Sequence, residues 1–309
     1  MDKSKITTKR VVLVSFIVNI LDIVTNLVVV VLTGSAVIFA ELMQGVSDSI
    51  GSFFLLIGYK RSIKVKDATH PFGYGREAFF WTLLSALVML LLGSGFSIVR
   101  GYSQLINPKP IDYPILVFIV LCLSTTTNGY AFYQSVRKIK LKDHSMLRSW
   151  KLSRNQLVKT SFLRDSLGTL AAVFGLSAIV VFELTGNLFF DGIGAIAIGL
   201  LVLIFSLILI TQSRHLITGE SVSKELLARI RKAVVSLPEI VTINNLYAVY
   251  SGTEQILVDA DLDIKDSLKT TDIEKLYDKV QSTVIKAVPE VRTVRINLNS
   301  STDKIAKIA

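Results

Sequence analysis

Six apolar runs constrain the fold of this chain more than any other feature. Each approaches or exceeds the roughly 20 residues that a helix needs to cross the hydrocarbon core of a bilayer. They lie near residues 11–33, 37–58, 79–99, 113–135, 161–183 and 192–213. With 51% hydrophobic residues and a mean hydropathy of +0.54, the chain is too apolar for an ordinary soluble protein. The pattern predicts an α-helical membrane protein with six transmembrane helices.

The basic residues between these runs indicate which connectors face the cytosol. The N-terminal tail and the connectors 59–78 and 136–160 hold 17 Lys and Arg residues, whereas the alternate connectors hold only Arg100 and Lys109. The positive-inside rule then places both termini in the cytosol. Because topology explains the net charge of +10, we expect no nucleic-acid partner. We also expect no cleavable signal peptide, since ten polar residues lead directly into a run of spanning length.

From about residue 215 the composition becomes that of a soluble domain. Leu226, Leu227, Ile230 and Val234 share one face of an amphipathic helix over 223–237. Further periodicity predicts strands, a helix and a last strand over 243–250, 255–264, 271–288 and 291–298. The order α-β-β-α-β indicates a small sheet covered by two helices. We therefore divide the chain into a six-span transmembrane domain over 1–213 and a cytosolic C-terminal α/β domain over 214–309.

Two of the apolar runs carry acidic residues at helical spacing. In the second run Glu41, Gln44 and Asp48 stand three and four residues apart and share one helical face. In the fifth run Ser161 precedes Asp165 by four residues, as Gln44 precedes Asp48. An Asp at the centre of a membrane costs roughly 2.5–3.5 kcal/mol on insertion scales. We therefore expect a divalent-cation site between these two helices.

Other polar residues leave alternatives open. In the first run Asn19, Asp22 and Asn26 share one helical face. These residues either make hydrogen bonds between helices, or Asp22 acts as a proton relay or as an outer-shell group of the cation site. In the connector 59–78, Asp67 and His70 are ordinary zinc ligands and a candidate loop metal site. The alternative is a polar surface turn, since Pro and Gly residues follow directly.

Two short sequence segments on either side of the second run indicate a family resemblance. Ser35-Ala36 leads into the acidic second run, and His70-Pro71-Phe72-Gly73-Tyr74-Gly75-Arg76-Glu77 follows that run. Together they resemble the cation diffusion facilitator family of metal-ion/proton antiporters, over nearly the whole chain. Phe80-Trp81 and Gly95-Phe96-Ser97 look similar to the branch that includes mitochondrial zinc-transporter-like members. The resemblance implies a homodimeric secondary transporter in the plasma (inner) membrane, which dimerises through the C-terminal domain. It also implies that the protein is not an enzyme and binds no permanent cofactor.

The resemblance also implies where the transported metal binds. The family places a His or Asp four residues before an Asp on the second and fifth spans, which here are Gln44, Asp48, Ser161 and Asp165. Both aspartates match and both upstream residues depart from the pattern. Glu41 is expected to supply a third carboxylate. This all-oxygen set favours Mg²⁺, Ca²⁺ or Mn²⁺, whereas the resemblance favours zinc, with manganese or iron as alternatives.

Arg76 and Glu220 match a charge pair that the family places at the dimer interface.

Arg164 is harder to interpret, because it stands beside Asp165. It either pairs with Asp22 or Glu41 across the bundle or neutralises the cation site. The second alternative predicts a non-transporting membrane scaffold or subunit that dimerises with an active relative. A third class, a membrane-anchored metal sensor, needs metal ligands in the C-terminal segment that the sequence does not show.

Overall fold

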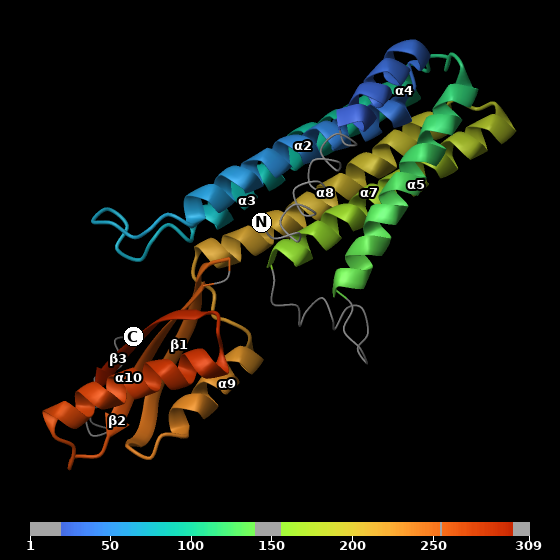
Figure 1. The fold of residues 1–309 in the computed structure, drawn as a ribbon. Helices are drawn as coiled ribbons and strands as arrows, with labels where there is room; N and C mark the ends of the chain where they lie inside the picture. Colours follow the sequence, from blue (N-terminus) through green and yellow to red (C-terminus); the bar gives the residue numbers. More distant parts are fainter. Residues whose placement is uncertain (1–19, 140–155, 254, 299–309) are drawn as a thin grey trace, which may run out of the picture. The chain divides into compact units, whose positions relative to one another are not determined.

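The computed structural model describes residues 20–139, 156–253 and 255–298 (Figure 1). The chain divides into two compact units. One contains Met1–Gly58 and Phe80–Ser213, and the other contains Tyr59–Phe79 and Arg214–Ala309. The connector between the second and third apolar runs therefore belongs with the C-terminal residues.

Helices form at each of the six predicted apolar runs, as far as the structure describes them. A first helix covers Ile20–Thr33. The others are α2 (Ala36–Ser62), α3 (Glu77–Val88) continued by the π-helix η1 (Met89–Phe96) and α4 (Ser97–Ile106), α5 (Pro114–Ile139), α7 (Gln156–Thr185) and α8 (Phe189–Ile217). They lie alongside one another as a helical bundle, and α5 packs against α7 (Figure 1). The predicted start of the first helix at residue 11 lies outside the described residues.

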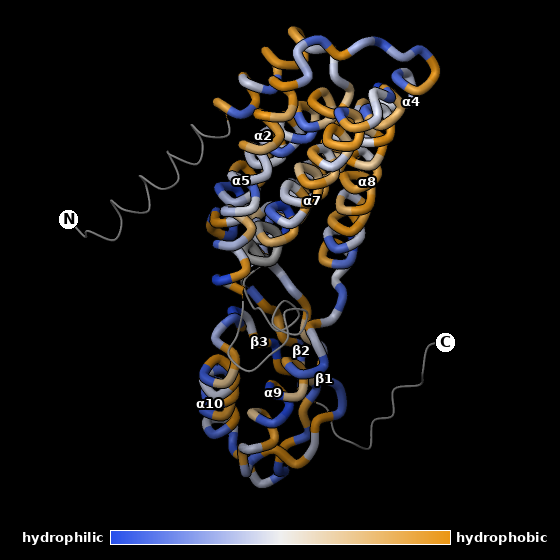
Figure 2. The backbone as a smooth tube through the Cα atoms, turned by 90° about the vertical axis from the view of Figure 1, so that its right-hand side faces the viewer, coloured by the Kyte–Doolittle hydropathy of each residue, from blue (hydrophilic) through white to orange (hydrophobic). Residues whose placement is uncertain are grey.

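Four of the described helices are long and apolar enough to cross a membrane, namely Glu77–Ile106, Pro114–Arg137, Phe162–Thr185 and Phe189–Ile217. Between 22% and 39% of the most apolar window of each is buried. Large apolar side chains such as Leu91, Ile115 and Leu184 therefore remain exposed, as expected for a surface that lipid covers. Hydrophobic residues predominate along the helices of the bundle (Figure 2). With 27 residues α2 is long enough to span, but it carries Glu41, Gln44 and Asp48 within its apolar run and is not among these four.

The N-terminus of α2 is held by a carboxylate from α8. Asp191 is completely buried and accepts hydrogen bonds from Ser35 Oγ at 2.7 Å and from the backbone N–H groups of Ala36 and Val37 at 2.8 and 3.1 Å. These bonds satisfy donors that a helix N-terminus leaves free, and the carboxylate complements the helix dipole. Although Asp191 lies in the first turn of α8, the helix that it caps is α2. The contact fixes the position of α2 along α8.

Small residues let these helices approach closely. A Cβ at Gly51 of α2 would lie 2.4 Å from Ser85 Oγ of α3. A Cβ at Gly101 of α4 would lie 2.7 Å from the carbonyl oxygen of Gly192 in α8. Such contacts replace the hydrophobic effect as the cause of helix association inside a membrane.

The C-terminal unit contains the α-β-β-α-β arrangement predicted from the sequence. Its elements are α9 (Lys224–Val235), β1 (Ile240–Gly252), β2 (Gln255–Ile264), α10 (Thr270–Ala287) and β3 (Val291–Leu298). The sheet order is β1-β2-β3, with β2 antiparallel to β1 and parallel to β3. Alternate residues of β2 are buried, among them Val258 and Ala260, and they pack with Ile230 and Val280 of the two helices. One face of the sheet is thus covered by α9 and α10 (Figure 1).

The connector that belongs to this unit touches the sheet at two points. A Cβ at Gly75 would lie 2.2 Å from the Ser251 carbonyl oxygen at the end of β1, so only glycine fits there. The guanidinium of Arg295 in β3 lies 4.5 Å from the ring centroid of Phe72. The residues around the His-Pro-Phe-Gly-Tyr-Gly string therefore pack as part of the C-terminal unit.

Candidate cation site

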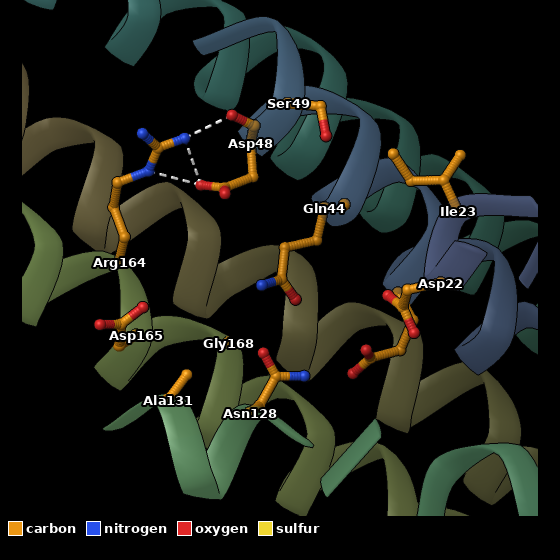
Figure 3. A pocket seen from close by; sticks show the side chains of 12 residues that line it. Asp22, Ile23, Gln44, Asp48, Ser49, Asn128, Ala131, Arg164, Asp165 and Gly168 are labelled. Carbon is orange, nitrogen blue, oxygen red and sulfur yellow. Dashed lines mark hydrogen bonds and ion pairs between the residues drawn. The ribbon is translucent and has the colours of Figure 1, made fainter. Parts of the chain in front are cut away.

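A cavity of about 150 Å³ lies among the helices of the first unit. Its lining comes from the first helix and from α2, α5 and α7: Asp22, Ile23, Glu41, Gln44, Gly45, Asp48, Ser49, Asn128, Ala131, Arg164, Asp165 and Gly168. The side chains of the labelled residues surround a common space (Figure 3). The structure thus brings the acidic faces of the second and fifth runs to one place. Their role in binding a cation stays a prediction.

Arg164 is paired with Asp48, across the cavity from α7 to α2. Its Nη2 lies 2.5 Å and its Nε 2.6 Å from Asp48 Oδ1, and Nη2 also donates to the Asp48 carbonyl oxygen (Figure 3). The side chains are 12% and 35% exposed, so the pair is mostly shielded from water. The sequence offered Asp22 and Glu41 as partners of Arg164. The structure instead pairs it with Asp48, one of the two aspartates expected to bind the metal.

Asp165 is also engaged. Its Oδ2 accepts a hydrogen bond from the hydroxyl of Ser135 on α5. Ser161, expected to complete the ligand set, lies on the backbone of α7, but its side chain lies outside the described residues. Both aspartates that the resemblance assigns to the metal site therefore already have partners.

Glu41 and Gln44 lie deeper in the bundle and are less well satisfied. Glu41 is only 5% exposed, and its Oε2 accepts one hydrogen bond, from Ser124 Oγ at 3.2 Å. Among the described residues, Glu41 Oε1 and Gln44 Oε1 are buried polar atoms with no hydrogen-bond partner. Buried polar atoms without partners are rare in native structures and each calls for an explanation. Here both atoms belong to residues that line the cavity.

Asp22 completes the charged lining. Its Oδ2 accepts a hydrogen bond from Asn26 Nδ2 at 3.3 Å, one helical turn along. This contact is within one helix, whereas the sequence suggested bonds between helices. Asp22 nevertheless lines the same cavity as Glu41, a position compatible with the predicted relay or outer-shell role.

The donor set is oxygen-rich and anionic. Four carboxylates line the cavity, from Asp22, Glu41, Asp48 and Asp165, against the single guanidinium of Arg164. Within residues 20–139, 156–253 and 255–298, no three His, Cys, Asp or Glu side chains are gathered as a metal cluster. A cation would therefore need carboxamide oxygens and water among its ligands.

Residues of α5 contribute to the site, although none of them was a candidate from the sequence. Ser124 bonds to Glu41, Asn128 lines the cavity and Ser135 bonds to Asp165. Together with Ala131, these residues follow one another at spacings of three and four, which is the signal that could have identified them. The hydroxyl groups of Thr125 and Thr126, between them, donate instead to carbonyl groups of their own helix.

The loop residues Asp67 and His70 lie side by side but form a turn. Asp67 Oδ1 accepts from the backbone N–H groups of Thr69 and His70 at 3.0 and 2.8 Å, and its Oδ2 accepts from Tyr74 Oη at 2.7 Å. Hydrogen bonds from Tyr74, Thr69 and His70 hold the pKa of the Asp67 carboxyl well below its usual range. The His70 ring stacks on Tyr74 with 4.0 Å between centroids. A loop metal site stays a prediction, and a polar turn accounts for these contacts.

Arg76 and Glu220 lie in the same unit. A Cβ at Gly219 would be 3.9 Å from Arg76 Nη2, so Arg76 approaches the residue next to Glu220. Glu220 itself pairs with His215, at 3.2 Å between Oε2 and Nδ1. The proposed pairing of Arg76 with Glu220 at a dimer interface remains a prediction.

Comparison with known proteins identifies several relatives of this chain. The human proton-coupled zinc antiporter SLC30A9, mitochondrial, is 23% identical over 294 residues, covering 92% of this chain and 51% of that protein. Metal tolerance protein C4 of Arabidopsis thaliana is 28% identical over 204 residues, covering 65% and 45%. This chain thus spans about half the length of these relatives. Magnetosome protein MamB of Magnetospira sp. is 23% identical, with 92% of both chains covered.

A solved nickel form of a MamM C-terminal domain variant matches 25% of this chain and 98% of its own, at 15% identity and a TM-score of 0.24. The cation efflux transmembrane domain family matches residues 12–217. That match covers the first helix through α8, including every residue that lines the cavity. The chain therefore belongs to the cation diffusion facilitator family of metal-ion transporters.

Proposed function

We propose that this protein is a secondary transporter that exports a divalent metal cation in exchange for protons. The observation that carries the proposal is the cavity, in which the acidic faces of α2 and α7 meet inside a member of a metal-transporting family. Buried carboxylates in membrane helices are costly and are typical of ion and proton pathways. The donors are Asp48 and Asp165, completed by Gln44, Ser161 and Glu41.

Proton exchange follows from the chemistry of these donors. A carboxylate must lose its proton before it can hold a dication, so metal and protons compete for the same oxygens. A carrier that exposes the cavity alternately to the two sides of the membrane would therefore release metal on one side and return with protons. Asp22 lines the same cavity and is the proposed proton relay.

Zinc is the leading candidate as substrate, because a relative is named a zinc antiporter. Manganese and iron are the alternatives, since carboxylate and carboxamide oxygens suit harder cations than zinc. We place the protein in the plasma (inner) membrane as a homodimer with both termini in the cytosol. The named mitochondrial location of a relative makes an organelle membrane the competing assignment.

The ion pair between Arg164 and Asp48 favours a second candidate function. A guanidinium that stays on Asp48 occupies the place of a metal and cancels its charge. The protein would then be a non-transporting membrane subunit that dimerises with an active relative. Both candidates predict the same fold and differ only in whether the cavity takes up a cation.

Uptake into proteoliposomes distinguishes the two. Purified protein is reconstituted, a pH gradient is imposed, and entry of Zn²⁺, Mn²⁺, Fe²⁺ or Co²⁺ is followed with an internal metal-sensitive dye. We expect gradient-driven uptake of at least one cation, strongly reduced in Asp165→Asn. Glu183→Gln, at an exposed position of α7, is the matched control and should transport normally. Absence of uptake for all four cations would support the scaffold instead.

A further inference from the structure

The connector that follows α2 begins with a short segment in which exposed apolar and basic residues alternate. Ile63 and Val65 are 61% and 83% exposed, and the exposed Lys64 and Lys66 stand next to them. Exposed apolar residues that gather in one place among polar ones mark sites of interaction with a protein or a membrane. We call residues 63–66 the connector patch.

The length of α2 places the connector patch at the membrane surface. α2 has 27 residues and ends at Ser62, which corresponds to about 40 Å of helix. That length matches the roughly 40–45 Å of a bilayer with its headgroup regions. Tyr59, Lys60 and Arg61 form the last turn of α2, where aromatic and basic residues are typical of the headgroup level. Residues 63–66 follow directly, and four residues extend no further than about 14 Å.

Contacts within the connector fix the shape in which the patch is presented. Asp67 Oδ1 accepts hydrogen bonds from the backbone N–H groups of Thr69 and His70, and the His70 ring stacks on Tyr74. Lys64 Nζ lies 5.7 Å from the centroid of the same Tyr74 ring. A surface that is already ordered loses less conformational entropy when it binds. These bonds also engage the carboxylate of Asp67, the acidic residue that follows the patch.

We propose that the connector patch binds the anionic headgroup surface of the bilayer. Ile63 and Val65 insert at the boundary with the acyl chains, as the apolar residues of interfacial segments do. Lys64 and Lys66 contact lipid phosphates, because a lysine can bury its stem and keep its ammonium group at the polar level. Each lysine near an anionic leaflet strengthens such binding by about fivefold. The contact anchors the cytosolic end of α2.

This inference goes beyond the proposed transport and does not depend on it. It rests on the cytosolic placement of the connector, because the cytosolic leaflet carries the anionic lipids. Charge complementarity favours lipid over a second copy of the chain, which would bring the same lysines face to face.

Hydrogen exchange of the full-length protein in nanodiscs tests the contact. Exchange at residues 63–66 is compared between nanodiscs of phosphatidylcholine alone and of phosphatidylcholine mixed with phosphatidylglycerol. Wild type should exchange several-fold more slowly in the anionic nanodiscs, and high salt should reduce the difference because it screens exposed charges. Equal exchange in the two kinds of nanodisc would overturn the proposal.

Removal of the basic charge separates lipid binding from a role in topology alone. Lys64→Gln/Lys66→Gln keeps two long side chains and should abolish most of the difference between the two lipids. Lys275→Gln/Lys286→Gln removes two exposed lysines from α10 and should behave as wild type. If the connector variant kept the full difference, the lysines would not contact lipid and the proposal would fail.

Removal of the apolar side chains tests insertion. Ile63→Ser/Val65→Ser keeps the charge and should speed exchange at the patch in both lipids, after correction for the intrinsic rates. Val241→Ser, at a 61% exposed position of β1, is the matched control and should leave the patch unchanged. Exchange at residues 69–70, which Asp67 holds, reports whether the connector stays folded. Protection that is equal in both lipids and requires two copies in one nanodisc would assign the patch to a second chain and refute lipid binding.

Discussion

Arg164 of α7 holds Asp48 of α2 through two nitrogens, Nη2 at 2.5 Å and Nε at 2.6 Å from one carboxylate oxygen. The pair joins two helices whose relative movement would open the cavity in a rocking carrier. It also neutralises one of the carboxylates that line the cavity. Breaking a buried pair by removing one partner typically costs about 3–5 kcal/mol, because the remaining charge is left uncompensated. Since Asp48 is 35% exposed, the cost here should be smaller.

Replacing Arg164 tests its role as a counter-cation. Arg164→Gln makes the cavity more negative by one charge, so Mn²⁺ affinity should rise several-fold, up to about tenfold. Arg164→Lys keeps the charge and should behave nearly as wild type. Equilibrium titration of the purified protein measures the effect, with Arg214→Gln, an exposed position near the end of α8, as the control.

The same variants separate the two candidate functions. If wild type transports, Arg164→Gln changes the cation concentration needed for half-maximal uptake. If wild type is a scaffold kept inactive by Arg164, the variant gains uptake. Equal affinities in Arg164→Gln, Arg164→Lys and wild type would show that the guanidinium does not influence the cavity.

Two helical glycines should respond oppositely to alanine. Gly101→Ala places a methyl group 2.7 Å from the Gly192 carbonyl oxygen, a backbone atom that cannot turn away. Overpacking of this kind costs about 1–3 kcal/mol, so the thermal midpoint in detergent should fall. Gly129→Ala meets nothing within 4 Å and should be neutral or slightly stabilising, because alanine favours helix more than glycine does. Similar midpoints for both variants would contradict close packing of α4 on α8.

The loop around Asp67 should depend on pH in one direction. Hydrogen bonds from Tyr74, Thr69 and His70 lower the pKa of Asp67 below its unfolded value of about 3.9. A depressed carboxyl pKa contributes stability above the unfolded pKa, and this stability is lost as the pH falls toward the folded pKa. Hydrogen exchange of residues 64–74, corrected for the intrinsic rate, should therefore stay constant between about pH 7 and 5 and increase only under stronger acid.

Asp67→Ala supplies the control for this prediction. It should exchange rapidly at every pH, whereas Asp266→Ala, at an exposed position elsewhere in the same unit, should not change the loop. Added Zn²⁺ should not slow exchange in a simple polar turn. Strong protection by Zn²⁺ would instead support the loop metal site at Asp67 and His70.

Much of the architecture could be predicted from local patterns. The bounds of β2 and β3 agree with the alternation read from the sequence, and α9 and α10 agree within about two residues, the usual uncertainty of helix ends. The length of the apolar runs placed the membrane helices. Residues of the candidate site on α2 were identified because an acidic face at helical spacing is conspicuous within an apolar run.

Other parts of the site could not be predicted from spacing. Ser124 and Ser135 contact Glu41 and Asp165 only because α5 packs against α7 and α2, and hydroxyl groups alone do not distinguish such contacts from bonds within a helix. Likewise Asp191 lies in the first turn of α8, and only packing shows that the helix it caps is α2.

The sequence by itself determined that an acidic pair, a carboxamide and an arginine lie in helices of spanning length, because periodicity and charge are local properties. Only the tertiary structure decided which groups meet. A long guanidinium can reach several carboxylates, and helix packing selected Asp48 over Asp22 and Glu41. That choice leaves Glu41 buried with a free oxygen, so the question of where a cation binds depends on an interhelical contact that spacing does not encode.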